Sequence, residues 1–202
     1  MFFVVRHGNT FQADTKPRRI GARTDLPLTA RGIEQARALG RYFSAEEVAF
    51  QRVLVSPLAR TRQTASEILR YQDAPPQPVH ADFLREIDHG PDENQLEEAV
   101  LNRIGPGALA AWEKQAEIPP GWIVEPSDRI AAWHELFRSS PKDCPTLLVT
   151  SNGAARFAIM ADPSLMSEAA ALVSLKLPTG GFGVIARRDD GNLSLLSWGE
   201  RP

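Results

Sequence analysis

Cysteine, histidine and long apolar segments are all scarce in this sequence of 202 residues. The one cysteine, Cys144, excludes an intrachain disulfide and any metal site built from several cysteines. The apolar segment Met1–Val5 stops at a basic residue and is far shorter than a membrane span, which needs about 20 apolar residues. We therefore expect a cytoplasmic protein with no membrane partner.

A strong charge imbalance is also missing, because the formal net charge is -2 at pH 7. Such a chain has no general attraction to nucleic acid, and we predict no nucleic-acid partner. What is present is the ordinary balance of a globular protein, with 43% hydrophobic and 24% charged residues. We expect a single domain over residues 1–202, with an insertion or cap at about residues 75–126.

Short apolar runs alternate with segments of helical periodicity, which predicts an α/β layered fold. We expect strands at residues 2–5, 52–55, 146–150, 182–188 and 193–198, with a short extended piece at 79–83. We expect helices at residues 30–43, 56–71, 92–103, 108–117 and 152–160, and one that begins at Ser127. Thr29, Ser127 and Asn152 are the predicted helix caps, and Asp190-Gly191 predicts a two-residue hairpin turn.

Polar clusters follow three of the predicted strands, at Arg6–Thr10, Ser56–Arg60 and Ser151–Gly153. In open α/β sheets, ligands bind beyond the carboxyl ends of the strands, and helix N-termini in that region favour anions. The guanidinium groups of Arg6 and Arg60 match the oxygens of a phosphate. These features predict a pocket for a phosphate-like dianion.

Three ordered blocks identify a family resemblance. Val5-Arg6-His7-Gly8-Asn9-Thr10 resembles the Arg-His-Gly motif of the histidine phosphatase superfamily, which is also called phosphoglycerate mutase-like. The blocks Thr24–Gly32 and Ser56–Ala65 resemble later segments of the same family, in the same order. Together with the alternating elements, the resemblance implies a three-layer α/β/α sandwich with a mostly parallel central sheet and a C-terminal hairpin. It implies no metal and no other cofactor.

The resemblance also implies catalytic roles for four residues. His7 would be the nucleophile that forms a phosphohistidine, and Arg6 and Arg60 would hold the phosphoryl oxygens. Glu86 resembles the family's general acid, since a glycine follows it four residues later. A carboxyl group beside a bound phosphate is kept protonated by like-charge repulsion, so it can donate to a leaving alcohol. Asp88 is the alternative acid, because it alternates with Glu86 along an extended segment.

Asn152 marks the largest departure from the family. Many relatives have a second histidine after the late strand, followed by glycine, whereas this chain has Asn152-Gly153. Asparagine can donate one hydrogen bond but carries no charge, and charged hydrogen bonds contribute about 1.5–3 kcal/mol against about 1 for neutral ones. After Gly90, the aromatic-acidic-glycine sequence of many relatives is replaced by Pro91-Asp92-Glu93-Asn94. The predicted substrate-binding residues are Asn9, Thr10, Arg23, His89, Asn152 and Gly153.

Three functional hypotheses follow for a small phosphorylated ligand. The first is a metal-independent phosphomonoesterase, and the second is a phospho-ligand binding or regulatory protein whose catalysis Asn152 has weakened. The third and less favoured hypothesis is a phosphoglycerate mutase. Lys16, Arg18, Arg19 and Arg23 form a basic segment that could steer a polyanionic substrate, although a solvated loop is the preferred interpretation. The sequence predicts neither the natural substrate nor the oligomeric state.

Overall fold

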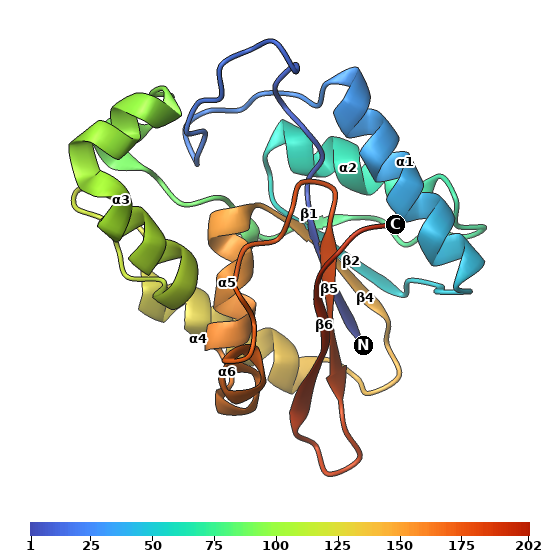
Figure 1. Ribbon diagram of the computed structural model, residues 1–202. Coiled ribbons are helices and arrows are strands. Elements are labelled where there is room, and N and C mark those ends of the chain that lie inside the picture. The colour runs from blue at the N-terminus through green and yellow to red at the C-terminus, as the bar shows by residue number, and fades with distance from the viewer.

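A six-stranded sheet forms the centre of the computed structural model, which describes residues 1–202 (Figure 1). The strand order is β3-β2-β4-β1-β5-β6. The first four strands in this order run parallel, and β5 is antiparallel to both β1 and β6. The bounds are β1 Phe2–Arg6, β2 Arg52–Val55, β3 Val79–His80, β4 Thr146–Thr150, β5 Phe182–Arg187 and β6 Leu193–Glu200.

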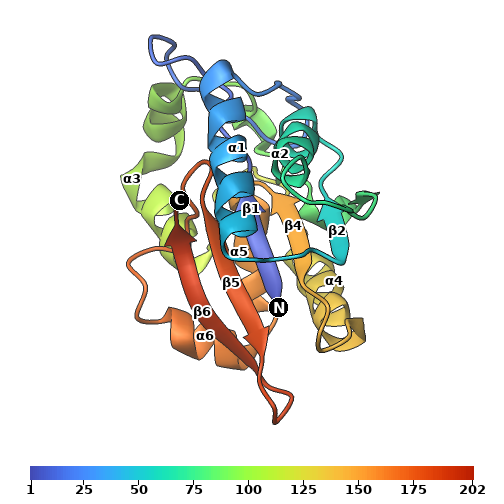
Figure 2. The same ribbon diagram turned by 90° about the vertical axis from the view of Figure 1, so that its right-hand side faces the viewer.

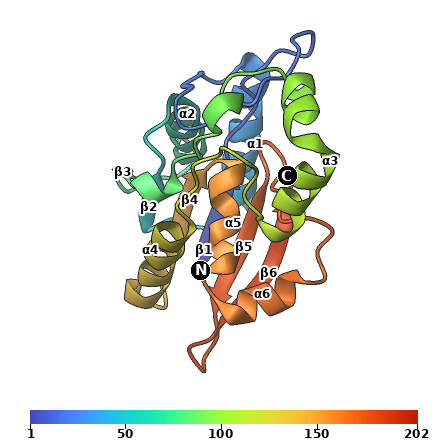
Figure 3. The same cartoon turned by 90° about the vertical axis from the view of Figure 1, so that its left-hand side faces the viewer.

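Helices cover both faces of this sheet. One face carries α1 (Ala30–Ala45) and α2 (Ala59–Leu69), which lie in front of the sheet in Figure 2. The opposite face carries α4 (Pro126–Ser139), α5 (Asn152–Met160) and α6 (Pro163–Ala169), as Figure 3 shows, and α3 (Glu97–Gln115) lies beside them. The predicted three-layer α/β/α sandwich with a C-terminal hairpin is therefore confirmed.

Alternating side chains of the central strands supply the two halves of the core. Phe2 and Val4 of β1 point into the larger cluster, between the sheet and the layer that contains α5. Phe3 and Val5 point into the smaller cluster, against α1 and α2. Because β1 and β4 are buried on both faces, each contains an uninterrupted apolar run, Phe2–Val5 and Leu147–Val149, and this is why the sequence predicts them well.

Several helix boundaries differ from the prediction. Thr29 is the N-cap of α1, and its hydroxyl accepts from the Gly32 N–H at 3.1 Å, as predicted. However, α2 begins at Ala59 rather than at Ser56-Pro57. Ser127 lies inside α4, which begins at Pro126, and the N-cap position of α5 is Ser151 rather than Asn152. The prediction missed α6, whose N-cap is Asp162.

Residues 75–126 contribute β3 to the sheet edge and then pass through two short 3-10 helices, η1 (Asp82–Leu84) and η2 (Gly90–Asp92). The extended piece is shorter than predicted, and the helix expected at residue 92 begins only at Glu97. Gly105, with a φ of 79°, kinks α3 where the sequence predicts a break between two helices.

The C-terminal hairpin has a longer turn than the sequence predicts. The Arg188 N–H donates to the Asn192 carbonyl at 2.8 Å, so the residues between them, 189–191, form the loop. Gly191 adopts a φ of 88°, the left-handed position that a three-residue hairpin loop requires. None of the helices is long and apolar enough to cross a bilayer.

Candidate functional site

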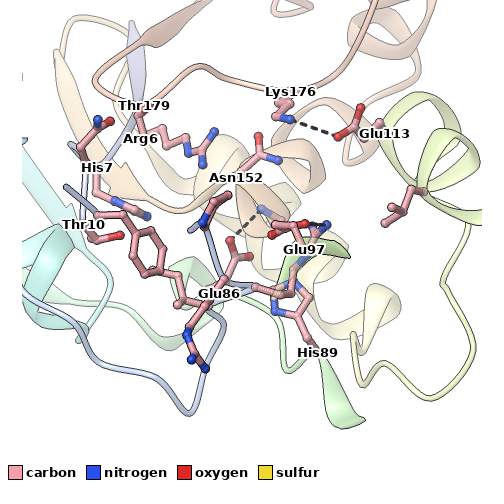
Figure 4. Close-up of a pocket in the computed structure, with 18 of the residues that line it drawn as sticks. Arg6, His7, Thr10, Glu86, His89, Glu97, Glu113, Asn152, Lys176 and Thr179 are labelled. Atoms are coloured by element: carbon pink, nitrogen blue, oxygen red, sulfur yellow. Dashed lines mark hydrogen bonds and ion pairs between the residues drawn. The ribbon is translucent and has the colours of Figure 1, made fainter. Parts of the chain in front are cut away.

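A pocket of about 530 Å³ opens at the carboxyl ends of β1 and β4. Four of the predicted site residues on its walls are Arg6, His7, Glu86 and Asn152. Figure 4 shows that their side chains point toward a common space. The parallel register pairs Arg6 with Thr150, so the segments that follow the two strands emerge side by side. The topology therefore brings together residues that are almost 150 positions apart in the sequence.

His7 is buried at the end of β1, with 4% of its surface exposed. Its Nδ1 lies 2.8 Å from the Gly8 carbonyl oxygen, which can only accept, so Nδ1 carries the proton and Nε2 the lone pair. Burial, followed by the charges of Arg60 and Arg6, lowers the pKa of His7 well below its usual value of 6.5. The imidazole is therefore neutral at physiological pH.

The two predicted arginines are used differently. Arg60, at the start of α2, donates from Nε to His7 Nε2 at 3.2 Å. Both of its terminal nitrogens donate away from the pocket, to the carbonyl oxygens of Thr24 (2.7 Å) and Gly21 (3.1 Å). Arg6 lines the pocket and donates from one terminal nitrogen to the Leu177 carbonyl at 2.7 Å. Burial lowers the pKa of Arg6 to about 10, which leaves it charged at neutral pH.

Glu86 is the predicted acid that reaches the pocket. Glu86 is buried, with 6% of its surface exposed. Its carboxylate accepts from the Gly153 N–H at 3.1 Å and from the Ile87 N–H at 2.9 Å. Asp88, the alternative acid, does not line the pocket. Its two carboxylate oxygens are engaged instead by Arg23 Nε at 2.9 Å and by the Gly90 N–H at 2.7 Å.

Asn152 lies on the pocket wall in the first turn of α5. Its Oδ1 accepts from the Leu177 N–H at 3.1 Å, which leaves the Nδ2 group without a hydrogen bond inside the protein. Leu177 is thus held twice, through its N–H by Asn152 and through its carbonyl by Arg6. The hydrogen bond from Leu177 explains why Asn152 does not cap α5, because its amide oxygen accepts from the loop before β5 and not from an N–H of the helix.

The remaining predicted binding residues divide into two groups. Asn9, Thr10, His89 and Gly153 line the pocket. Arg23 does not, because its guanidinium is paired with Asp88 and also donates to the Gly90 carbonyl at 2.6 Å.

Sequence reasoning missed the far wall of the pocket. Figure 4 shows Glu97 and the ion pair of Lys176 with Glu113 at the end away from His7, and the pair measures 3.1 Å. Arg19, which was expected in a solvated loop, also lines the pocket and pairs with Glu97 at 2.5 Å. These residues come from α3 and from two separate loops, so no local motif identifies them.

Ser151 belongs to the predicted polar cluster Ser151–Gly153, but it does not line the pocket. It follows Thr150 as His7 follows Arg6, so the strand register places Ser151, rather than Asn152, level with His7. Its hydroxyl is fully buried and makes no hydrogen bond within the protein.

Comparisons with known proteins agree with this geometry. Residues 2–200 match the family model described as the histidine phosphatase superfamily (branch 1). The chain is 31% identical to a 2,3-bisphosphoglycerate-dependent phosphoglycerate mutase from Methylobacterium sp. (strain 4-46) over 121 residues, which are 59% of this chain and 57% of the mutase. The chain thus matches less than two thirds of that relative's length.

Two solved structures have the same fold. A mycobacterial glucosyl-3-phosphoglycerate phosphatase superposes with a TM-score of 0.75 at 19% identity, covering 98% of this chain and 97% of the other. The α-ribazole phosphatase from Shigella flexneri superposes with a TM-score of 0.70 at 23% identity, covering 99% and 96% of the two chains. At these identities, the likeness concerns the fold alone.

Proposed function

This chain belongs to the histidine phosphatase superfamily, branch 1, and from that premise we propose that it hydrolyses phosphomonoesters through a phosphohistidine at His7. The observation that carries the proposal is the state of His7: it is a neutral, buried imidazole with its proton fixed on Nδ1 and its lone pair on Nε2. A neutral imidazole nitrogen can attack phosphorus at neutral pH, and a covalent intermediate divides the hydrolysis into two easier steps.

In the first step, the Nε2 lone pair of His7 attacks phosphorus while the bond from phosphorus to the ester oxygen breaks. Arg60 Nε donates to this lone pair in the free protein, so a bound phosphoryl oxygen must accept that N–H in place of His7 Nε2 before the new bond forms. Arg6 adds a buried positive charge on the same wall, and the Nδ2 group of Asn152 offers a neutral donor. These groups offset the negative charge of the phosphoryl oxygens.

Glu86 supplies the proton that the leaving alkoxide needs. It faces the same space as His7, so its carboxyl group lies where it can donate to the ester oxygen as the phosphorus–oxygen bond breaks. In the second step, water attacks the phosphohistidine, the nitrogen–phosphorus bond breaks, and Glu86 takes up the proton of that water. The products are an alcohol and inorganic phosphate, and His7 returns to its starting state.

A panel of phosphomonoesters, assayed with a metal chelator present, tests the proposal. We expect turnover by the natural sequence and at least a thousandfold lower kcat, roughly, for His7→Ala, because removing a nucleophile removes the covalent route. Rapid quenching should also trap a protein-bound phosphate that acid releases. The matched control is His134→Ala, which removes an exposed histidine of α4. Full activity of His7→Ala would refute the proposal.

The neutral side chain of Asn152 supports a second function, that of a phospho-ligand binding or regulatory protein with weak catalysis. Here the protein would bind inorganic phosphate through Arg6, yet turn over no member of the panel. Robust hydrolysis of any phosphomonoester would exclude this function. Asn152→His and Ser151→His, compared side by side, would then show whether a chargeable group at either position increases the rate.

The mutase function rests on the curated relative and is tested by the same panel. A mutase must protect its phosphohistidine from water, so phosphoryl transfer between the hydroxyl groups of a phosphoglycerate would exceed hydrolysis. Release of inorganic phosphate without such transfer would exclude this function.

A further inference from the structure

Glu93 is a buried carboxylate that the proposed reaction does not use. Its side chain is 6% exposed and follows η2, and it does not line the pocket itself but lies behind His89, whose Nδ1 is 3.6 Å from Glu93 Oε2. It accepts three hydrogen bonds, from the Gly21 N–H at 2.9 Å, from the Thr24 hydroxyl at 2.6 Å and from the His89 N–H at 3.3 Å. Burial alone would raise the pKa of Glu93, but the His89 side chain, followed by the Thr24 hydroxyl and the Gly21 and His89 N–H groups, lowers it to about 2, so the carboxylate is ionised at neutral pH.

The two loop residues that Glu93 holds are the residues that hold Arg60. The Gly21 carbonyl accepts from one terminal nitrogen of Arg60 at 3.1 Å, and the Thr24 carbonyl accepts from the other at 2.7 Å. Because both terminal nitrogens of the Arg60 guanidinium are hydrogen-bonded, its Nε is directed at His7 Nε2. A continuous series of hydrogen bonds therefore runs from Glu93 through the backbone of residues 21–24 to Arg60 and the nucleophile.

The segment 21–24 has little freedom to take another position. The Ala22 N–H donates to the Ile87 carbonyl at 3.0 Å, and a side chain at Gly21 would overlap both that carbonyl and Glu93 Oε2. Asp25 adds an anchor on the other side by accepting from the Ala59 N–H at 2.6 Å. Of the two carboxylates in this arrangement, Glu93 is the one that bonds to both residues whose carbonyls face Arg60.

We propose that Glu93 is a positioning residue for the nucleophile: by fixing Gly21 and Thr24 it orients the Arg60 guanidinium and, through Arg60 Nε, the imidazole of His7. The proposal rests on the proposed function for its kinetic consequence, but its structural consequence at His7 holds without any substrate. Around His7, the charged groups are Arg6 on β1, Arg60 on α2 and Glu86 from the segment after η1.

Glu93→Gln tests this role with a side chain of the same shape. We expect kcat to fall about tenfold with a smaller change in KM, because a charged hydrogen-bond acceptor is lost away from the substrate. We also expect the pKa of His7, followed by NMR in the free protein, to rise, because a less confined Arg60 places less positive charge at the imidazole. Since the neutral form of His7 attacks, the acid limb of kcat/KM should move to higher pH.

Glu67→Gln is the matched control. Glu67 lies on α2, is 16% exposed and pairs with Arg37 at 2.8 Å, so its substitution also removes a half-buried ion pair without touching the site. Equal kcat values and unchanged His7 titrations in the two variants would overturn the proposal. If the natural protein shows no turnover, the proposed function fails, while the NMR titration still decides the role of Glu93.

A double variant separates positioning from general loss of structure. If Glu93 acts through Arg60, Glu93→Gln should cost little further activity in the Arg60→Ala background, because the path to His7 is already cut. Full additivity of the two losses would contradict the proposal.

Should Glu93→Gln fold poorly, Thr24→Val is the substitute test. It removes one donor to Glu93 but keeps the carbonyl that binds Arg60, and we expect kcat to fall about threefold. An unchanged kcat and His7 titration in Thr24→Val would then count against it.

Discussion

At His7, one backbone carbonyl decides which nitrogen can react. Because the Gly8 oxygen accepts from Nδ1, the lone pair lies on Nε2, and Arg60 Nε faces that same atom. Both terminal nitrogens of Arg60 bond to the carbonyls of Gly21 and Thr24, so Arg60 orients the imidazole in the free protein and can offer a phosphoryl oxygen only its Nε–H. Arg6, whose guanidinium reaches the pocket, is the better-placed arginine for the phosphoryl oxygens.

Gly153 places a comparable constraint on the proposed acid. Its N–H donates to Glu86 at 3.1 Å, and a methyl group in place of its hydrogen would overlap Glu86 Oε1. Gly153→Ala should therefore displace the carboxylate and lower kcat about tenfold or more, because a misplaced general acid loses most of its effect. The loss should be larger for alkyl than for nitrophenyl phosphates, since a poor leaving group depends more on protonation.

Gly107→Ala is the control for that substitution, because a methyl group there meets no atom within 4 Å. Steady-state kinetics and the thermal unfolding of both variants give the comparison. Equal activity of the two alanine variants would show that Glu86 does not depend on Gly153 for its position.

At the scale of elements, the sequence predicts best what burial dictates. The strands β1, β2 and β4 appear as short apolar runs because helices cover both faces of the sheet, and their bounds agree with the prediction within one residue. Helix starts are predicted less well because cap residues have other possible partners. Asn152 is a favoured cap residue, but its amide bonds to Leu177, which follows it by 25 positions.

The same distinction applies to the site. His7, Arg6 and Arg60 lie in local motifs beside predicted strands, so the sequence alone is enough to name them as candidates. The far wall depends on α3 and on loops that meet only in the folded chain. Glu93 stands in a segment where the family pattern is incomplete, and nothing in the sequence indicates that its partners are Gly21 and Thr24.

The connection between α6 and β5 is the element on which Asn152 acts. Leu177 in this connection is held by Asn152 and Arg6, and the Gly180 N–H donates to the His7 carbonyl at 3.1 Å. Asn152→Ala should loosen this wall and remove a neutral donor, and we expect KM to rise about three- to tenfold. Asn192→Ala, in the distant hairpin, is the control; a KM equal to that control would mean that Asn152 contributes nothing to binding.

At the scale of the molecule, cationic side chains gather in the pocket although the net charge of the chain is -2. The pocket collects four cationic side chains, which are Arg6, Arg18, Arg19 and Lys176. The pocket has three carboxylates: Glu97 and Glu113 are paired with Arg19 and Lys176, and the third is the proposed acid, Glu86. Arg6 and Arg18 pair with no carboxylate, and of these two Arg6 lies beside His7, so its charge is the one nearest the nucleophile. Binding of inorganic phosphate should therefore depend on Arg6 more than on overall charge.

Phosphate should stabilise the folded protein through this arginine. A ligand that binds only the native state at 100 times its Kd contributes about 2.7 kcal/mol, which for a chain of this size raises Tm by about 5–10 °C. We expect this rise in the natural protein and its loss in Arg6→Met, measured by thermal unfolding across a phosphate titration. Arg138→Met removes an exposed arginine of α4 and should keep the full rise, which also accounts for the general stabilising effect of phosphate salts. If Arg6→Met keeps the same rise, phosphate binds elsewhere, and the pocket beside His7 loses its strongest support as the site of phosphoryl transfer.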